Sequence, residues 1–427
     1  MILFAALLLF VGFSNSFEKE APKIETSDLI FYNGKGALKV AASDNYELKS
    51  LDLYLQENDG SWLHIDSKKS RDKSIELELK ISRPELSKMR IKAVAKDASY
   101  WMLGNSTSKI IDVVIDSKKP QLSLIEHSYS VEKGGAALAV FSLQEEHLER
   151  LWIEVNGKEF EAIELGSAGK YAALLPWDIK DESFKASVFA LDKAGNKSVL
   201  SLPFFIKNRE YRKSEIKLSE SFLNGKIAEL FDRFNDEEAK SSTESFKFIN
   251  ETLRDKNDKL LKQNSMDIHE SKLPTTFKLS VFLPLKNAQK VGDFGDFRTY
   301  IKDEVKASTS YHLGLDLAST KEALILLSNP GLVVFAGENG IYGNSLLIYH
   351  GLGLYSLYGH CSHLLVQKGD RLNAGAVIAK TGATGLALGD HLHFALLIQG
   401  VEVRPQQWMD AKWMRENVFD ILKKIAD

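Results

Sequence analysis

The stretch GDHLHFALLI, residues 389–398, places two histidines two positions apart at the start of a short apolar run. A short apolar run that follows a glycine is typical of a β-strand. Alternate side chains of a strand share one face, so His391 and His393 point the same way, with Cα atoms roughly 6–7 Å apart, while Leu392 faces the opposite layer. Two neutral imidazoles at that spacing can serve one metal ion and the substrate beside it. The alternative is a pair of histidines on a solvated edge.

Histidine is concentrated in this part of the chain. Six of the ten histidines lie after residue 310, namely His312, His350, His360, His363, His391 and His393. A cluster of this density favours a functional site over a chance distribution on the surface. For His350 and His363 we expect a supporting or plain surface position.

A further candidate segment is SYHLGLDLAST, residues 310–320, in which His312 and Asp316 are four positions apart with Gly314 between them. In a straight strand the two side chains would lie ~13 Å apart, too far to share an ion. A bend at Gly314 would bring both to one ion. The ligand types predict one zinc ion per chain, with three protein ligands that leave the fourth position to water, as in catalytic zinc sites. A closed structural zinc site usually includes thiolates, and the chain has a single cysteine, Cys361.

Two more residues are candidates for catalysis or substrate binding. His360, in LYSLYGHCSHLLVQKGD (residues 354–370), lies where a strand rich in Tyr and Leu meets a turn. A free imidazole beside metal-bound water can act as a general base or stabilise the charge of a tetrahedral intermediate. Arg298, in FGDFRTY (residues 294–300), is a candidate for a bidentate contact to a substrate carboxylate, and a structural ion pair is the alternative.

Three of these motifs, HLGLD, LYGH and GDHLHF, resemble in order and spacing those of the M23 family of zinc metallopeptidases, also called the lysostaphin or LytM family. The segment VQKGDRLNAGAVIAKTGATG is similar to the family's glycine-punctuated hairpin before its His-x-His strand. FGDFRTY and RPQQW further resemble exported bacterial members with N-terminal accessory regions. The resemblance covers residues 275–427 and implies an antiparallel β core with an open groove.

The resemblance also implies residue roles that spacing alone leaves open. His312, Asp316 and His393 match the zinc ligands of the family. His360 and His391 match the catalytic pair that orients the water and stabilises the oxyanion. The strand pattern by itself does not decide which of His391 and His393 holds the metal.

Members of this family hydrolyse peptide bonds in the stem peptides or cross-links of peptidoglycan, so the resemblance implies cell-wall remodelling with peptidoglycan as the partner. Some relatives have lost metal ligands and act as non-catalytic activators that bind and regulate other wall hydrolases. All five positions are filled here, which favours a zinc metalloendopeptidase. One departure is KEALILLSNPG (residues 321–331), which is more apolar than the family's usual small-residue stretch. Substrate preference is therefore not carried over from the family.

Length, charge and cysteine content narrow the remaining possibilities. A chain of 427 residues is too long for one hydrophobic core and predicts several domains. The net charge of −3 gives no global attraction to nucleic acid, and one cysteine excludes an intrachain disulfide. Residues 2–13 form an apolar run that is too short to cross a bilayer but has the length of a signal-peptide core. We therefore expect a signal peptide at residues 1–16, with an uncleaved anchor as the alternative, and a periplasmic or cell-envelope location.

The segments between the leader and residue 275 differ in pattern. Short alternating runs predict two β-sandwich modules, at 24–116 and 117–208, with one irregular β domain as the alternative, and their late strands resemble those of immunoglobulin-like bacterial surface modules. A faint internal repeat supports two modules; it pairs Ala95, Asp97, Gly104 and Asn105 with Ala190, Asp192, Gly195 and Asn196. Residues 213–272 carry apolar residues at helical spacing and predict a helical connector packed on a neighbouring domain. The predicted fold class is multidomain and mainly β, and the N-terminal modules or the connector are candidates to cover the groove and inhibit the enzyme.

Overall fold

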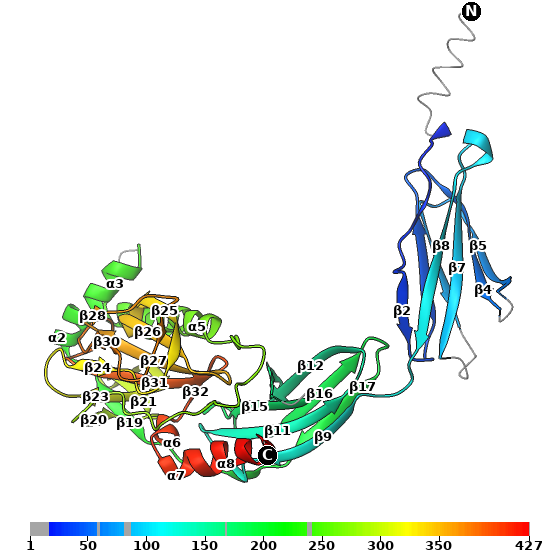
Figure 1. The fold of residues 1–427 in the computed structure, drawn as a ribbon. Coiled ribbons are helices and arrows are strands. Elements are labelled where there is room, and N and C mark those ends of the chain that lie inside the picture. Colours follow the sequence, from blue (N-terminus) through cyan, green and yellow to red (C-terminus); the bar gives the residue numbers. More distant parts are fainter. Residues whose placement is uncertain (1–16, 58–59, 81–86, 167–168, 237–240, 427) are drawn as a thin grey trace, which may run out of the picture. The chain divides into compact units, whose positions relative to one another are not determined.

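The computed structural model describes residues 17–57, 60–80, 87–166, 169–236 and 241–426. The predicted signal peptide, residues 1–16, lies outside the described residues. The described chain is mainly β, as the sequence predicts (Figure 1). It divides into two compact units, the first comprising 1–120, 145–150 and 190–198, and the second 121–144, 151–189 and 199–427. Among the described residues, no helix combines the length and apolar character that crossing a bilayer requires.

The first unit contains two sheets around one core. The larger sheet has the order β2 (Leu29–Tyr32), β8 (Ser106–Ile115), β7 (Lys88–Asp97), β4 (Leu48–Gln56) and β5 (Trp62–Lys69). The smaller has the order β1 (Lys23–Ile24), β3 (Leu38–Ser43) and β6 (Ser74–Leu79). Buried residues alternate with more exposed ones along β7, because only one face of the strand packs on the core. The immunoglobulin-like character of this module stays a prediction.

A second β module lies mainly in the second unit and also has two sheets. One has the order β14 (Ile163–Glu164), β15 (Lys170–Pro176), β11 (Ala136–Gln144) and β9 (Gln121–His127); the other has the order β13 (Lys158–Phe160), β12 (Leu148–Val155), β16 (Ala186–Asp192) and β17 (Lys197–Leu202). A short parallel pair joins β10 (Ser130–Glu132) and β18 (Phe205–Lys207). Along β11, Leu138 and Val140 belong to the core of the C-terminal region, whereas Ala139 and Phe141 belong to the core of the module. The second module and the C-terminal region therefore share buried surface.

The C-terminal region, residues 275–427, is built on an antiparallel sheet, as the resemblance implies (Figure 1). Its strand order is β20 (Gln289–Gly292), β23 (Leu315–Ala318), β31 (Leu392–Ile398), β27 (Leu354–Cys361), β26 (Asn344–Tyr349), β25 (Gly331–Glu338) and β29 (Arg371–Leu372), with β32 (Val401–Val403) paired to β31. A smaller sheet joins β24 (Leu324–Leu326), β30 (Val377–Lys380) and β28 (His363–Leu364). Helices α6 (Pro405–Trp408), α7 (Ala411–Met414) and α8 (Asp420–Ala426) follow.

The central strands β27 and β31 are buried on both faces. In β31, Phe394 and Leu396 point into one core, while Ala395 and Leu397 point into another on the opposite face. This double burial explains why the apolar run after the histidines is continuous, since a strand with one solvated face would alternate between apolar and polar residues.

Helices of the predicted connector cover the second face of this sheet. They are α2 (Glu220–Phe222), α3 (Ala228–Phe234), α4 (Ser242–Lys247) and α5 (Arg254–Asn264), with π-helical turns at Leu223–Ile227 and Phe248–Leu253. Their apolar residues, among them Leu223 and Ile249, share a core with Tyr355 and Leu397 of the sheet. Ser219 begins α2 by accepting a hydrogen bond from the backbone N–H of Phe222.

The connector also contributes a strand that the helical pattern did not predict. β19 (Lys213–Lys217) pairs in parallel with β21 (Phe297–Lys302), which pairs with β22 (Val305–Tyr311). The segment therefore completes a sheet of the C-terminal region in addition to packing on it. The domain boundaries of the sequence analysis stay predictions.

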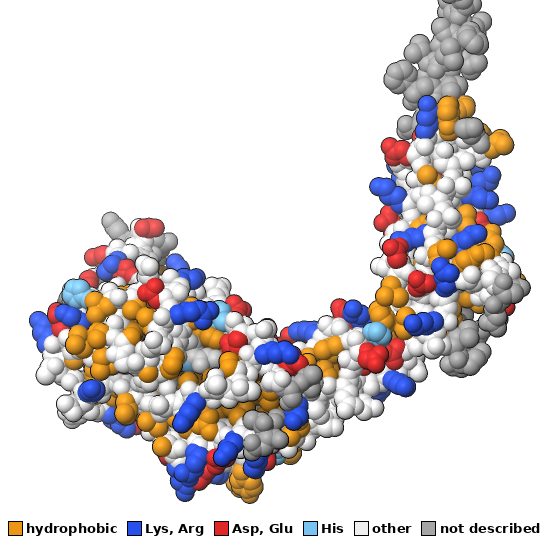
Figure 2. Space-filling view, in the orientation of Figure 1, with side chains coloured by type: hydrophobic (Ala, Val, Ile, Leu, Met, Phe, Trp, Pro, Cys, Tyr) orange, Lys and Arg blue, Asp and Glu red, His pale blue; other side chains and the backbone are white. Residues whose placement is uncertain are grey.

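Both signs of charge are interspersed on the face of each unit that Figure 2 shows. This distribution agrees with the small net charge of the chain. It shows no broad basic surface on that face of the kind that binds nucleic acid.

Candidate metal centre and groove

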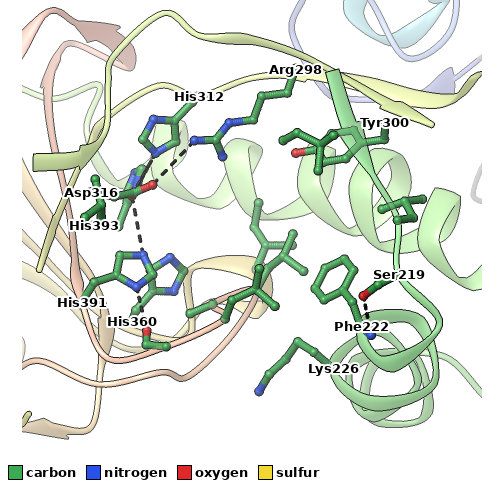
Figure 3. Close-up of a pocket in the computed structure, with 18 of the residues that line it drawn as sticks. Ser219, Phe222, Lys226, Arg298, Tyr300, His312, Asp316, His360, His391 and His393 are labelled. Carbon is green, nitrogen blue, oxygen red and sulfur yellow. Dashed lines mark hydrogen bonds and ion pairs between the residues drawn. The ribbon is translucent and has the colours of Figure 1, made fainter. Parts of the chain in front are cut away.

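Three predicted metal ligands converge at one end of the central sheet (Figure 3). His312 follows β22, Asp316 lies in β23 and His393 lies in β31, where it is directly opposite Asp316 in the register of the two strands. Asp316 Oδ1 is 2.9 Å from His312 Nε2 and 3.0 Å from His393 Nδ1, and the two ring nitrogens are 3.2 Å apart. The structure thus brings together one carboxylate oxygen and two imidazole nitrogens.

Two glycines leave room for this arrangement. A Cβ on Gly314 would lie 2.6 Å from Cε1 and Nε2 of the His393 ring, and a Cβ on Gly292 would lie 2.3 Å from Asp316 Oδ2. The bend that the sequence predicts at Gly314 is present in the structure. Gly314 is not among the glycines with positive φ, and its lack of a side chain also leaves space for the imidazole.

Hydrogen bonds fix the orientation of the His312 ring. Its Nδ1 lies 2.7 Å from the carbonyl oxygen of Asp293, which accepts the Nδ1 proton and leaves Nε2 free to act as a ligand. His393 presents Nδ1 instead. His312 and His393 are 7% and 6% exposed, so both nitrogens are removed from bulk water.

Burial and neighbouring imidazoles control the charge of the centre. Burial alone would raise the pKa of the Asp316 carboxyl, but His312 and His393 beside it hold that pKa well below its usual range. Burial lowers the pKa of His393 to about 4, although Asp316 opposes the shift. The centre therefore presents an ionised carboxylate and a neutral imidazole of His393 at neutral pH.

The two predicted catalytic histidines lie beside this centre (Figure 3). The rings of His360 and His391 have centroids 4.8 Å apart, and His391 Nε2 is 3.7 Å from Asp316 Oδ1. Each ring holds its Nδ1 at 2.8 Å from a carbonyl oxygen, that of Thr384 for His360 and that of Gly389 for His391. In the neutral tautomer with a proton on Nδ1, both residues keep Nε2 as the reactive nitrogen.

His360 has a left-handed backbone, with φ of 62°. Such a conformation costs roughly 1–3 kcal/mol for a residue with a side chain and is common at functional sites. Burial, together with the nearby His393 and His391, lowers the pKa of His360 to about 3. His391 is more accessible, with 15% of its side chain exposed, and lies one residue before β31.

Arg298 forms the structural ion pair that the sequence analysis gave as an alternative. Its Nε lies 3.3 Å from Asp296 Oδ2 and its Nη2 3.7 Å from Asp316 Oδ2 (Figure 3). Arg298 therefore pairs with a predicted metal ligand.

A groove of about 730 Å³ extends from the centre. His360 and His391 lie on one side of it, and connector residues, including Ser219, Phe222 and Lys226, lie on the opposite side (Figure 3). The segment 386–390 also lines the groove. The connector thus shapes the groove, and autoinhibition stays a prediction.

Sequence reasoning missed some of the residues that line this site. Tyr342 is buried beside His393, with ring centroids 5.6 Å apart, and its hydroxyl donates to Asp258 at 2.8 Å. The paired glycines of GIYG were an available signal for the turn that carries Tyr342. His350 is buried and bonded to the Pro330 carbonyl and to Ser356, so it supports the fold at a distance from the groove.

Comparisons with known proteins agree with this geometry. The sequence profile described as "Peptidase family M23" matches residues 310–405. DD-carboxypeptidase/endopeptidase Mpg of Neisseria meningitidis is 36% identical over 94 residues, which is 22% of each chain. Murein hydrolase activator NlpD of Escherichia coli is 34% identical over 105 residues, 24% of this chain and 27% of NlpD. The chain thus spans about a quarter or less of the length of these relatives.

Among solved structures, the catalytic domain of the antimicrobial peptidase lysostaphin from Staphylococcus simulans is 24% identical. The alignment covers 31% of this chain and 98% of that one, with a TM-score of 0.27. The profile match includes all five predicted site residues, from His312 to His393. By this match, residues 310–405 in the C-terminal region carry a peptidase family M23 domain.

Proposed function

We propose that the protein is a zinc-dependent endopeptidase that hydrolyses peptide bonds in the stem peptides or cross-links of peptidoglycan. The supporting observation is the convergence of His312, Asp316 and His393 beside two further imidazoles, His360 and His391. Of the two sequence relatives above, Mpg is named a DD-carboxypeptidase/endopeptidase and NlpD a murein hydrolase activator. We place the protein in the periplasm or cell envelope for the same reason.

The donor set suits zinc. Two imidazole nitrogens and one carboxylate oxygen lie within 4.8 Å of one another, and three such ligands are the usual protein complement of a catalytic zinc site. The glycines at 292 and 314 leave space where a Cβ would displace Asp316 or His393. Zinc bound by these residues would supply a Lewis acid that polarises the scissile carbonyl and acidifies water.

The remaining histidines would handle the proton. His360 and His391 face the groove with Nε2 free, because each Nδ1 is engaged by a backbone carbonyl. One neutral Nε2 would accept the proton of the attacking water, and the other ring would donate to the oxygen that gains negative charge only as an imidazolium, protonated at Nε2 as well. The carbonyls of Thr384 and Gly389 hold the Nδ1 protons and leave both Nε2 atoms toward the groove.

The second candidate function is non-catalytic activation of another wall hydrolase. It is favoured by the similarity to NlpD, which is named as a murein hydrolase activator. A complete set of five site residues argues for catalysis instead, since a binding role alone would not need the paired imidazoles beside the metal ligands.

The test measures two quantities for the purified full-length protein and its variants. One is the zinc content, and the other is the release of soluble peptides from purified peptidoglycan. We expect one zinc per chain and peptide release in the wild type, loss of both in His393→Ala, and loss of release with zinc retained in His360→Gln. If the wild type bound peptidoglycan without cutting it, and His393→Ala behaved identically, the activator function would replace the enzymatic one.

A further inference from the structure

A second cavity, of about 310 Å³, adjoins the groove at the metal centre. The groove and this cavity share five lining residues, namely His312, His393, Arg254, Arg298 and Tyr342. The smaller cavity does not include His360 or His391 among its lining residues. It therefore extends from the metal centre away from the two proton-handling histidines, where the other side of a bound peptide would lie.

The small cavity is cationic. Lys180, Arg254 and Arg298 line it, against the single carboxylate of Asp258. Arg298 is engaged by Asp296 and Asp316, as described above. Burial raises the pKa of Asp258 although Arg254 opposes the shift, so the one acid of the wall resists ionisation. The lining thus carries more positive than negative charge.

Hydrogen bonds hold the Arg254 guanidinium through Nε and Nη2 and leave Nη1 available for a ligand. Its Nε donates to the Asn250 carbonyl at 3.2 Å and its Nη2 to Asn250 Oδ1 at 2.9 Å. Asn250 is itself 1% exposed, and its Nδ2 donates to Ser308 Oγ at 2.8 Å in β22, the strand that leads to His312. Within the described part of the chain, no residue accepts a hydrogen bond from Arg254 Nη1 or from Lys180 Nζ.

We infer that this cavity is a subsite for a free carboxylate of the peptide substrate, with Arg254 as its principal ligand and Lys180 in support. The inference rests on the proposed function and narrows its substrate class to peptides with a free carboxylate close to the scissile bond. A guanidinium that is anchored on one edge presents its other N–H groups to a carboxylate with little loss of freedom. Arg254 belongs to the connector, so a specificity determinant of the peptidase lies outside the M23 domain itself.

The experiment uses full-length, zinc-loaded protein and two peptides of one cleavable stem-type sequence, ending in a carboxylate or in a carboxamide. We expect kcat/KM of the wild type to favour the carboxylate peptide about tenfold or more, as for a charge-assisted hydrogen bond. Arg254→Gln should bring that ratio close to one, and Arg254→Lys should keep part of it. Lys180→Gln, at an exposed position, should lower the ratio less and serves if Arg254→Gln fails to fold.

The matched control is Lys259→Gln on the same helix, because Lys259 is exposed and pairs only with Asp255 among the described residues. This variant should keep the wild-type ratio. A wild type that cleaves both peptides equally, or an Arg254→Gln variant that keeps the preference, would overturn the subsite. If the wild type cleaves neither peptide, the proposed enzymatic function fails. Calorimetry of the same two peptides then decides the subsite separately, since carboxylate-dependent binding that Arg254→Gln abolishes supports it and equal binding overturns it.

Discussion

Tyr342 packs its ring against the imidazole of His393, with centroids 5.6 Å apart. At the other end of the same side chain, the hydroxyl donates to Asp258 Oδ1 at 2.8 Å, in helix α5 of the connector. One tyrosine therefore bridges the predicted metal ligand and the helical layer that covers the sheet. Asn257 reinforces this contact, because its Oδ1 accepts from the backbone N–H of Ile341 at 2.9 Å.

The Tyr342 bridge predicts separate effects for two substitutions. Tyr342→Phe removes the hydroxyl and leaves Asp258 with one partner fewer, so we expect the free energy of unfolding to fall by about 1–3 kcal/mol. Tyr342→Ala also removes the ring beside His393 and should cost about 3–5 kcal/mol together with zinc affinity. Thermal denaturation and zinc titration measure the two effects. Tyr129→Phe, at an exposed tyrosine, is the control, and an equal effect of the two Tyr342 variants on zinc binding would argue against support of His393 by the ring.

Space at Gly314 predicts a steric effect on the metal centre. The methyl group of Gly314→Ala would lie 2.6 Å from the His393 ring, so the imidazole has to move. We expect weaker zinc binding, a large loss of peptidase activity and a fall of about 1–3 kcal/mol in the free energy of unfolding. Gly225→Ala is a matched control, because nothing lies within 4 Å of its added Cβ. Unchanged zinc affinity in Gly314→Ala would show that the site tolerates the shift.

Buried His350 predicts a pH dependence of stability. Burial lowers its pKa from 6.5 to about 4, so the unfolded chain binds a proton between these values that the folded protein does not. The contribution of neutral His350 is complete above pH 6.5 and is lost as pH falls, by up to about 3 kcal/mol near pH 4. Denaturant unfolding at pH 7.5, 5.5 and 4.5 should show the stability difference between wild type and His350→Gln changing in favour of the variant as pH falls. A constant difference for His350→Gln across these pH values would contradict the prediction.

The shared cores predict the outcome of truncation. A fragment of residues 275–427 loses the helices that cover Tyr355 and Leu397 and the strand β19 that pairs with β21. We expect it to be insoluble or poorly folded, whereas residues 121–427 keep both covering layers and should fold. Circular dichroism and thermal denaturation of the two fragments provide the measurement. The result also matters for the predicted autoinhibition. If removal of residues up to 270 is to raise peptidase activity, the remaining fragment has to stay folded.

The sequence predicted which residues gather at the site better than it predicted their surroundings. His312, Asp316 and His393 were identified from short motifs, and the structure brings them within contact of one another. A strand pattern places His391 and His393 near each other because alternation acts over two residues. The predicted bend at Gly314 is confirmed, but the same reasoning did not reveal the steric contribution of this glycine, since the clash that forbids a side chain there comes from a ring 79 positions along the chain.

Contacts between distant segments account for what was missed. The pattern of residues 213–272 indicates helices because their apolar stripe repeats at helical spacing, but nothing local reveals that β19 pairs with β21. Arg254 and Asp258 read as ordinary polar positions of an amphipathic helix. Their proximity to the metal centre depends on how that helix packs on the turn at Tyr342.

The parallel pairing of β19 with β21 restricts which insertions and deletions this part of the chain can accept during evolution. Ser214 lies opposite Arg298 in this pairing, and its hydroxyl donates at 2.7 Å to Asp296 Oδ1, whose other oxygen holds the Arg298 guanidinium. Inserting or deleting a single residue in β19 would turn Ser214 to the opposite face of the sheet. An ordinary interdomain linker tolerates such insertions and deletions. In β19 they would disturb Arg298, whose guanidinium pairs with Asp316.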